Sequence, residues 1–177
     1  MVEYTQFTES LLQQEAYDAQ LQSYIQSTLH IETYQIMEEE FGVIPMTNYK
    51  FSCGQGNVVN IGTAGGHTKG SSGFTFQFIQ KNTAAIVSAL VEGHTPQLSQ
   101  KFFDKRFHVY DSTLLRVLQH RLLGGDTIFA HLFQGNTPQQ VLEFLDNETN
   151  LIQELIVLQT VPTRVFLPAA LKEIFHV

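Results

Sequence analysis

The chain has 177 residues, with 10 Lys and Arg against 17 Asp and Glu, and a net charge of −7 at neutral pH. Scattered basic residues in an acidic chain argue against nucleic-acid binding, which relies on clustered Lys and Arg. The single cysteine, Cys53, excludes an internal disulfide and fits a reducing cytoplasm. No apolar run approaches the roughly 20 residues of a membrane-spanning helix. Polar residues from Glu3 onward interrupt any apolar leader, so we expect a cytoplasmic protein.

The first third of the chain predicts short strands around one helix. Residues 2–7 read as a strand that begins at once. Residues 14–29 carry apolar side chains at spacings of three and four, which predicts an amphipathic helix. Residues 31–37 are rich in Ile, Thr and Tyr and favour a second strand. A short apolar strand over residues 58–61 leads directly into a run of glycines.

The spacing of apolar residues then changes to that of a helix, and the remainder of the chain is predicted to be helical. A helix begins near Gly73 and stops at Gly93, since glycine is common just after a helix end. Asp111 or Ser112 is expected to cap the next helix.

Two later features complete the helical part. Thr137, Pro138 and Gln140 match a helix start, with a capping residue, Pro at the first position and Gln three residues after the cap. A final short helix is expected after Pro168. Strands and one helix followed only by helices predict an α+β piece with a helical tail.

The glycine stretch Gly62-Thr63-Ala64-Gly65-Gly66, followed by a polar loop and the helix near Gly73, is the candidate binding feature. Glycines let a backbone approach a ligand closely, and a helix start offers unpaired N–H groups. Phosphates and flavin carbonyl oxygens suit such a loop. A tight strand-to-helix turn without a ligand explains the pattern equally well. The stretch matches neither the dinucleotide-binding pattern G-x-G-x-x-G nor a P-loop.

Several short motifs follow one another along the chain. The first is a Glu followed two positions later by Thr, at Val2-Glu3-Tyr4-Thr5. Val43-Ile44-Pro45-Met46 precedes Ile61-Gly62-Thr63-Ala64-Gly65-Gly66, and Ser72-Gly73-Phe74 opens the next helix. The later motifs are Arg106 to Leu115, then Phe129-Ala130-His131-Leu132-Phe133, Pro138 and Phe144-Leu145-Asp146. In this order, the motifs resemble those of the lycopene β-cyclase family. The chain departs from the family where His67-Thr68-Lys69 replaces a His-Pro pair.

The resemblance implies an FAD/NAD(P)-binding flavoprotein fold of the glutathione-reductase or hydroxylase type. Residues 1–60 would be a remnant of the substrate-binding sheet region. Residues 61–93 would form a flavin-facing strand, glycine loop and helix, and residues 94–177 a helical C-terminal region. The implied cofactor-binding residues are Gly62, Thr63, Ala64, Gly65, Gly66, Ser72, Gly73 and Phe74.

The implied reaction closes the acyclic ends of lycopene, or a related acyclic carotenoid, into β-rings without net redox change. Reduced FAD is the implied cofactor and NAD(P)H its reductant. The acid would be a carboxyl group in an apolar pocket, where burial keeps carboxyls protonated. Glu3 matches the family's essential Glu, and Glu40 matches a second acidic region.

The family's FAD fingerprint lies near its N-terminus and does not occur in this sequence. We therefore expect a C-terminal fragment that is inactive alone, with an unpaired strand edge that invites homodimerisation. Peripheral membrane contact stays open. The alternatives are another FAD-dependent monooxygenase or reductase, and a non-catalytic α+β domain. The histidines show no metal-ligand spacing such as H-E-x-x-H, and Cys53 has no partner. His67 either approaches the flavin or, as is commoner for a loop histidine, lies in solvent.

Overall fold

The structure is a computed structural model, and it describes residues 1–96 and 104–175. The chain divides into two compact units, Met1–Gly42 and Val43–Val177. The boundaries predicted after residues 60 and 93 divide the chain by function rather than by compactness. They remain a prediction. Within the described ranges, no helix is long and apolar enough to cross a membrane.

The unit Met1–Gly42 consists of helix α1 (Gln14–Ser27) between two extended segments. The predicted helix is confirmed, but its apolar side is only partly covered, because Leu21 and Ile25 are half-buried and Tyr24 is exposed. It ends at Ser27, shortly before the chain turns into the left-handed region at His30 (φ 55°). The strands predicted at residues 2–7 and 31–37 are wrong. Strand-forming side chains give a strand only when a neighbouring strand accepts their backbone hydrogen bonds, and neither segment pairs in this unit.

The second unit opens with a small antiparallel hairpin. Its strands are β1 (Gly54–Gln55) and β2 (Val58–Val59), and they pair Gly54 with Val59 and Gln55 with Val58. The predicted strand over residues 58–61 is therefore confirmed only for its first half. Gly54 (φ 134°) has to be glycine, because a Cβ there would lie 2.1 Å from the Val58 carbonyl oxygen.

A short 3-10 helix, η1 (Gly62–Gly65), and then α2 (Phe76–Val91) follow the hairpin. The predicted stop of α2 is confirmed, since the helix ends just before Gly93, which takes the left-handed conformation (φ 74°).

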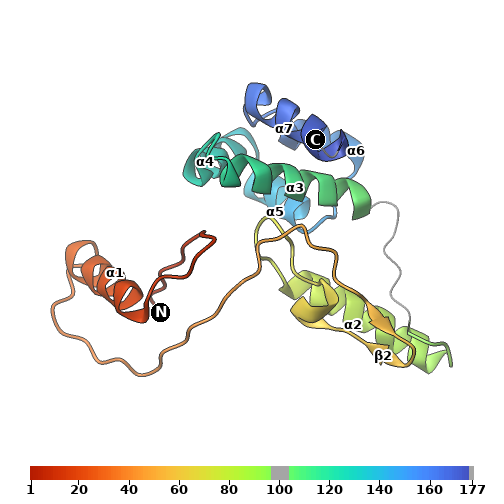
Figure 1. The fold of residues 1–177 in the computed structure, drawn as a ribbon, viewed down its shortest axis with the longest axis horizontal. Helices are drawn as coiled ribbons and strands as arrows, with labels where there is room; N and C mark the ends of the chain where they lie inside the picture. The colour runs from red at the N-terminus through yellow and green to blue at the C-terminus, as the bar shows by residue number, and fades with distance from the viewer. Residues whose placement is uncertain (97–103, 176–177) are drawn as a thin grey trace. The chain divides into compact units, whose positions relative to one another are not determined.

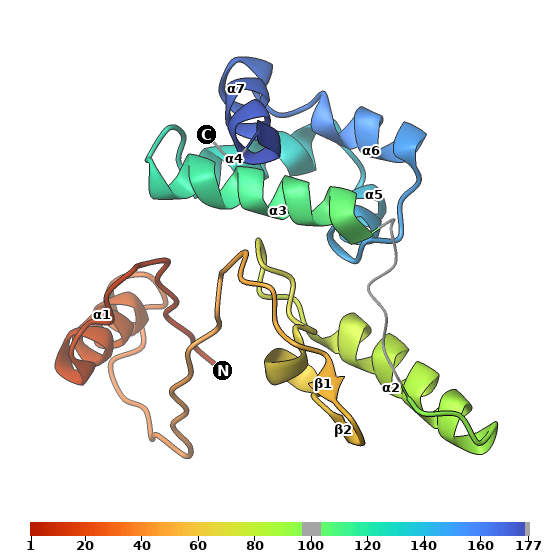
Figure 2. The same cartoon turned by 45° about the vertical axis from the view of Figure 1, so that its right-hand side comes forward.

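Helices α3 to α7 enclose the apolar core. Their bounds are α3 Asp104–Gln119, α4 Gly125–Gly135, α5 Pro138–Leu145, α6 Leu151–Leu158 and α7 Thr163–Phe175. α3 and α7 pack side by side (Figures 1 and 2). The buried apolar side chains come from these helices and the turn before α7: Phe107, Val117, Ile128, Leu132, Val141, Phe144, Leu145, Val157, Val161 and Ala169. The molecule is mostly helical, and β1 and β2 are the only strands in the described ranges.

The predicted helix start at Thr137 is confirmed, because a complete capping box forms there. The Thr137 hydroxyl accepts the Gln140 N–H, and the Gln140 side chain accepts the Thr137 N–H. Each contact satisfies a backbone donor that the first helical turn leaves without a partner.

Two other predicted boundaries are wrong. Asp111 and Ser112 cap nothing, because they lie in the middle of α3, which begins at Asp104. Pro168 lies inside α7 rather than before it. Proline removes one helical hydrogen bond, and the packing of Val165, Phe166 and Ala169 against the core offsets that loss.

A buried ion pair joins the start of α3 to α6. Glu154 is 1% exposed, and the Arg106 guanidinium donates to both of its carboxylate oxygens at 2.8 and 2.9 Å. The Tyr110 hydroxyl donates to Glu154 Oε2 at 2.9 Å. Burial, with the hydrogen bond to Glu154, raises the pKa of Tyr110 to about 12. The network satisfies both carboxylate oxygens of Glu154, as a buried charge requires.

Candidate functional site

The two candidate catalytic carboxylates, Glu3 and Glu40, lie in the unit Met1–Gly42, and both are exposed. The Thr5 hydroxyl donates to Glu3 Oε1 at 2.6 Å. A Thr two positions after the Glu is therefore close enough for its hydroxyl to reach the carboxylate. Because Glu3 is exposed, the apolar pocket that the resemblance implies around the acid is not seen in this unit.

A cluster of three aromatic rings holds the segments that carry these carboxylates. Tyr17 of α1 makes edge-to-face contacts with Tyr4 at 6.0 Å and with Phe41 at 5.6 Å between ring centroids. Tyr4 follows Glu3 in the chain, and Phe41 follows Glu40. The chain neighbours of both candidate residues therefore pack on the same ring, which brings the two acidic segments to one helix.

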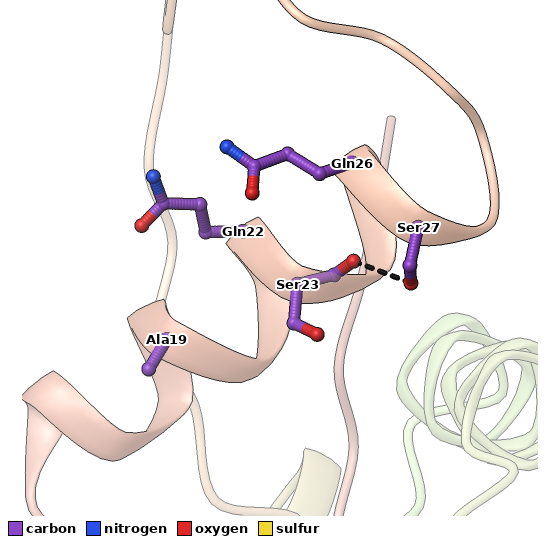
Figure 3. Close-up of a pocket in the computed structure, with 5 residues that line it drawn as sticks. All are labelled: Ala19, Gln22, Ser23, Gln26 and Ser27. Carbon is purple, nitrogen blue, oxygen red and sulfur yellow. Dashed lines mark hydrogen bonds between the residues drawn. The ribbon is translucent and has the colours of Figure 1, made fainter.

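Two open hollows lie on this unit. One, of about 490 Å³, is lined by Glu3, Tyr4, Thr5 and residues of α1 and its C-terminal end between Gln20 and Thr28. The other lies on α1 itself, and Figure 3 shows its lining residues Ala19, Gln22, Ser23, Gln26 and Ser27. The Ser27 hydroxyl there already donates to the Ser23 carbonyl at 2.6 Å. This second hollow has no charged side chain in its lining, whereas the first is lined by Glu3. The hollow beside Glu3 is therefore the better candidate for proton-transfer chemistry.

The glycine stretch lies in the second unit and forms η1, with Gly62 (φ 61°) and Gly66 (φ 75°) in the left-handed region. Packing requires glycine at position 65, and the left-handed backbone, together with a tight contact, requires it at position 66. A Cβ on Gly65 would lie 2.3 Å from the Asn60 carbonyl oxygen, and one on Gly66 would lie 3.2 Å from Phe51 Cβ. Gly62 differs, because a Cβ there would meet nothing within 4 Å. The loop is thus partly a tight turn and partly open at Gly62.

His67 is buried (5% exposed), so the expectation of a solvent-exposed histidine is wrong. Its Nδ1 accepts the Gly62 N–H at 3.2 Å, and the His67 N–H donates to the Gly62 carbonyl at 2.9 Å. Burial lowers the pKa of His67, which favours the neutral ring that this hydrogen bond needs. His67 therefore holds the first glycine of the stretch in place from inside the loop.

The structure brings sequence motifs that lie far apart together around this loop. A Cβ on Gly73 would lie 2.7 Å from Ile44 Cγ2 and 3.7 Å from Met46 Sδ. A Cβ on Gly70 would lie 2.5 Å from the Thr47 carbonyl oxygen. The segment around Met46 therefore packs on the turn before α2, which explains why glycine occupies positions 70 and 73.

The loop has features that fit a flavin. Thr63, Ala64 and Gly66 are exposed, as is Phe74, while Ser72 and Gly73 are half-buried. The Gly62 N–H is not a donor for the flavin, because His67 Nδ1 already accepts it. The N–H groups of Thr63 and Ala64, at the exposed start of η1, are the candidates to donate to ring oxygens or nitrogens. The open space at Gly62 leaves room for close approach.

Sequence reasoning did not show that the Tyr17 ring contacts the chain neighbours of both Glu3 and Glu40. The periodic spacing places it on the apolar side of α1, but nothing in the pattern shows which side chains meet its ring.

The family comparison agrees with the motif order. The family model described as "Lycopene cyclase protein" matches residues 1–171. The chain belongs to the lycopene cyclase family, whose members are enzymes with an FAD-binding fold. No curated protein and no solved structure matches the chain.

Proposed function

We propose that this chain is part of a lycopene cyclase that closes the acyclic ends of lycopene, or of a related acyclic carotenoid, into β-rings. The family match over residues 1–171 carries the proposal, because it spans every motif on which the resemblance rests. The reaction is an isomerisation in carotenoid biosynthesis and consumes no reductant overall.

Glu3 is proposed as the acid. Its carboxyl group gives a proton to the terminal double bond, the neighbouring double bond attacks the resulting cation and forms the ring, and a proton then leaves. Glu40 is proposed to take part in the same proton transfers. The Thr5 hydroxyl, which donates to Glu3 Oε1 at 2.6 Å, leaves the second carboxyl oxygen for the substrate.

An acid that protonates an alkene works best where water is excluded. Because Glu3 is exposed, we propose that the bound polyene covers it. The ring of Tyr4, which follows Glu3 in the chain and packs on Tyr17, offers apolar surface for that contact. A long hydrocarbon substrate also partitions into lipid, so we propose that the enzyme works on the inner face of the cell membrane.

FAD is proposed to lie against the glycine loop, held by Gly62, Thr63, Ala64, Gly65, Gly66, Ser72, Gly73 and Phe74. Reduced FAD, with NAD(P)H as its reductant, would supply negative charge that stabilises positive charge on the reacting end group. We expect the 177-residue chain by itself to bind FAD weakly and to be inactive, because G-x-G-x-x-G does not occur in it.

Cyclisation in heavy water tests the proposal. The complete protein, given lycopene, FAD and NAD(P)H, should form β-rings that each gain one deuterium, because a solvent-derived proton is added and another is lost. NAD(P)H consumption should not rise in step with ring formation. A monooxygenase or reductase would consume NAD(P)H stoichiometrically, and a non-catalytic domain would give no product; either result would contradict the proposal.

A further inference from the structure

Lys69, in the polar loop between η1 and α2, carries a buried charge. Its side chain is 1% exposed. The ammonium group donates to Asn147 Oδ1 at 2.7 Å and lies 2.9 Å from Asp111 Oδ1. It also lies 5.5 Å from the centre of the Phe107 ring. Lysine is almost never fully buried without a partner, and here partners from distant parts of the chain enclose it.

These partners fasten the loop to the helical region. Asp111 lies in α3, and Asn147 lies in the turn between α5 and α6, in the left-handed region (φ 59°). The Ser71 hydroxyl donates to the same Asp111 Oδ1 at 2.6 Å. Two loop side chains, two positions apart, therefore meet one carboxylate.

The backbone of Lys69 also closes the turn that precedes α2. Its N–H donates to the Phe74 carbonyl at 2.8 Å, and its carbonyl accepts the Gly73 N–H at 2.9 Å. Lys69 thus belongs both to the clamp on α3 and to the turn that contains Gly73 and Phe74.

We infer that Lys69 is a positioning residue, whose clamp by Asp111 and Asn147 fixes the loop Gly62–Phe74 in the shape that receives the flavin. The inference rests on the proposed function, in which this loop faces FAD. Lys69 acts through the loop backbone rather than by contact with the flavin. A loop already ordered before binding loses less conformational freedom when its ligand arrives, so its affinity is higher.

A second lysine provides a matched control. Lys81 of α2 pairs with Glu148 at 2.7 Å and donates to the Asp146 carbonyl at 3.3 Å, so it also reaches the turn between α5 and α6. Its side chain is 46% exposed. An exposed pair contributes little, because water screens it, and neither of these two contacts involves the glycine loop.

The test compares Lys69→Met with Lys81→Met in the complete protein. Hydrogen exchange at the amides of His67, Lys69 and Gly73 reports the loop, and quenching of flavin fluorescence reports FAD affinity. Lys69→Met should speed exchange and weaken FAD binding by about tenfold or more, since a buried pair is broken. Lys81→Met should leave both within about twofold.

Lys69→Met leaves Asp111 without its cation, so Lys69→Met/Asp111→Asn serves as the second variant. It removes both charges, and its melting temperature should return toward that of the wild type while loop protection and FAD affinity stay reduced. Wild-type protection and affinity in the double variant would overturn the inference. If the wild type binds no FAD, the proposed function fails, and loop exchange still decides whether Lys69 holds the loop.

Discussion

At the scale of single residues, buried polar groups order the regions around the candidate site. Glycines and short motifs in the sequence point to the loop, but Lys69 bonds to Asn147, 78 positions away, and no motif shows that the His67 ring turns back onto Gly62. The sequence therefore favours a solvent-exposed loop histidine. It assigns no role to Lys69, because the P-loop pattern that would use a lysine does not occur. Both side chains are buried. The His67 ring accepts a backbone N–H of its own loop, and the Lys69 ammonium pairs with Asp111 of α3.

Acid should loosen the loop through His67. Burial lowers the pKa of His67 below its ordinary value of 6.5. Its contribution to stability is therefore fully present above about pH 6.5 and is lost as the pH falls through the folded-state pKa. Denaturation measured between pH 7.5 and about pH 5 should show this loss. His67→Asn, whose amide oxygen can accept the Gly62 N–H, should remove that part of the pH dependence; an unchanged dependence would contradict the assignment.

Alkali should act on the Tyr110–Glu154 contact. The folded-state pKa of Tyr110 is raised to about 12 from 10.0. The stability that it contributes is present below pH 10 and is lost as the pH rises toward 12. Ultraviolet titration should show a late phase in which one tyrosine ionises near pH 12, and Tyr110→Phe should remove that phase. A Tyr110→Phe protein that keeps the late phase would show that another tyrosine titrates there.

At the scale of elements, the helices follow from the sequence more closely than the strands do. The spacing of apolar residues in α1 and the capping residues before α5 act locally, so sequence can predict them. The strands expected at residues 2–7 and 31–37 need partners from elsewhere in a chain, and β2 forms only where β1 pairs with it. Pro168 suggests a helix start, but tertiary packing holds α7 together around it.

The capping box before α5 should be measurable. Thr137→Ala removes the acceptor for the Gln140 N–H, and it should lower the free energy of unfolding by about 1 kcal/mol. Thr127→Ala, in the first turn of α4 but not at its cap, is the control and should change stability less. Equal losses in the two variants would show that the cap is not the cause.

The Tyr17 ring should order both acidic segments. Tyr17→Ala removes the contacts with Tyr4 and Phe41, so amides in residues 2–8 and 38–42 should exchange faster. Gln22→Ala changes an exposed side chain of the same helix that does not line the hollow beside Glu3, and it should leave those segments unchanged. Faster exchange in both variants would point to a general loss of α1 instead.

At the scale of the whole molecule, two structural observations lie in motifs that the family match covers. The family model covers residues 1–171, the Glu-x-Thr motif forms a hydrogen bond, and the glycine loop is clamped to the helical region. The order of short motifs along the chain is enough to predict the family. The contact that clamps the glycine loop is not predictable in the same way, because Lys69 and Asn147 lie 78 positions apart in the chain.

Pigment analysis of lycopene-accumulating cells that express the complete gene, as wild type and as Glu3→Gln, decides whether the protein is a cyclase with Glu3 as its acid. We predict β-carotene or a related cyclised product from the wild type, and uncyclised lycopene from Glu3→Gln at a comparable protein level. Normal cyclisation by Glu3→Gln would contradict the assignment of Glu3 as the acid, and no cyclised product from the wild type would contradict the proposed function.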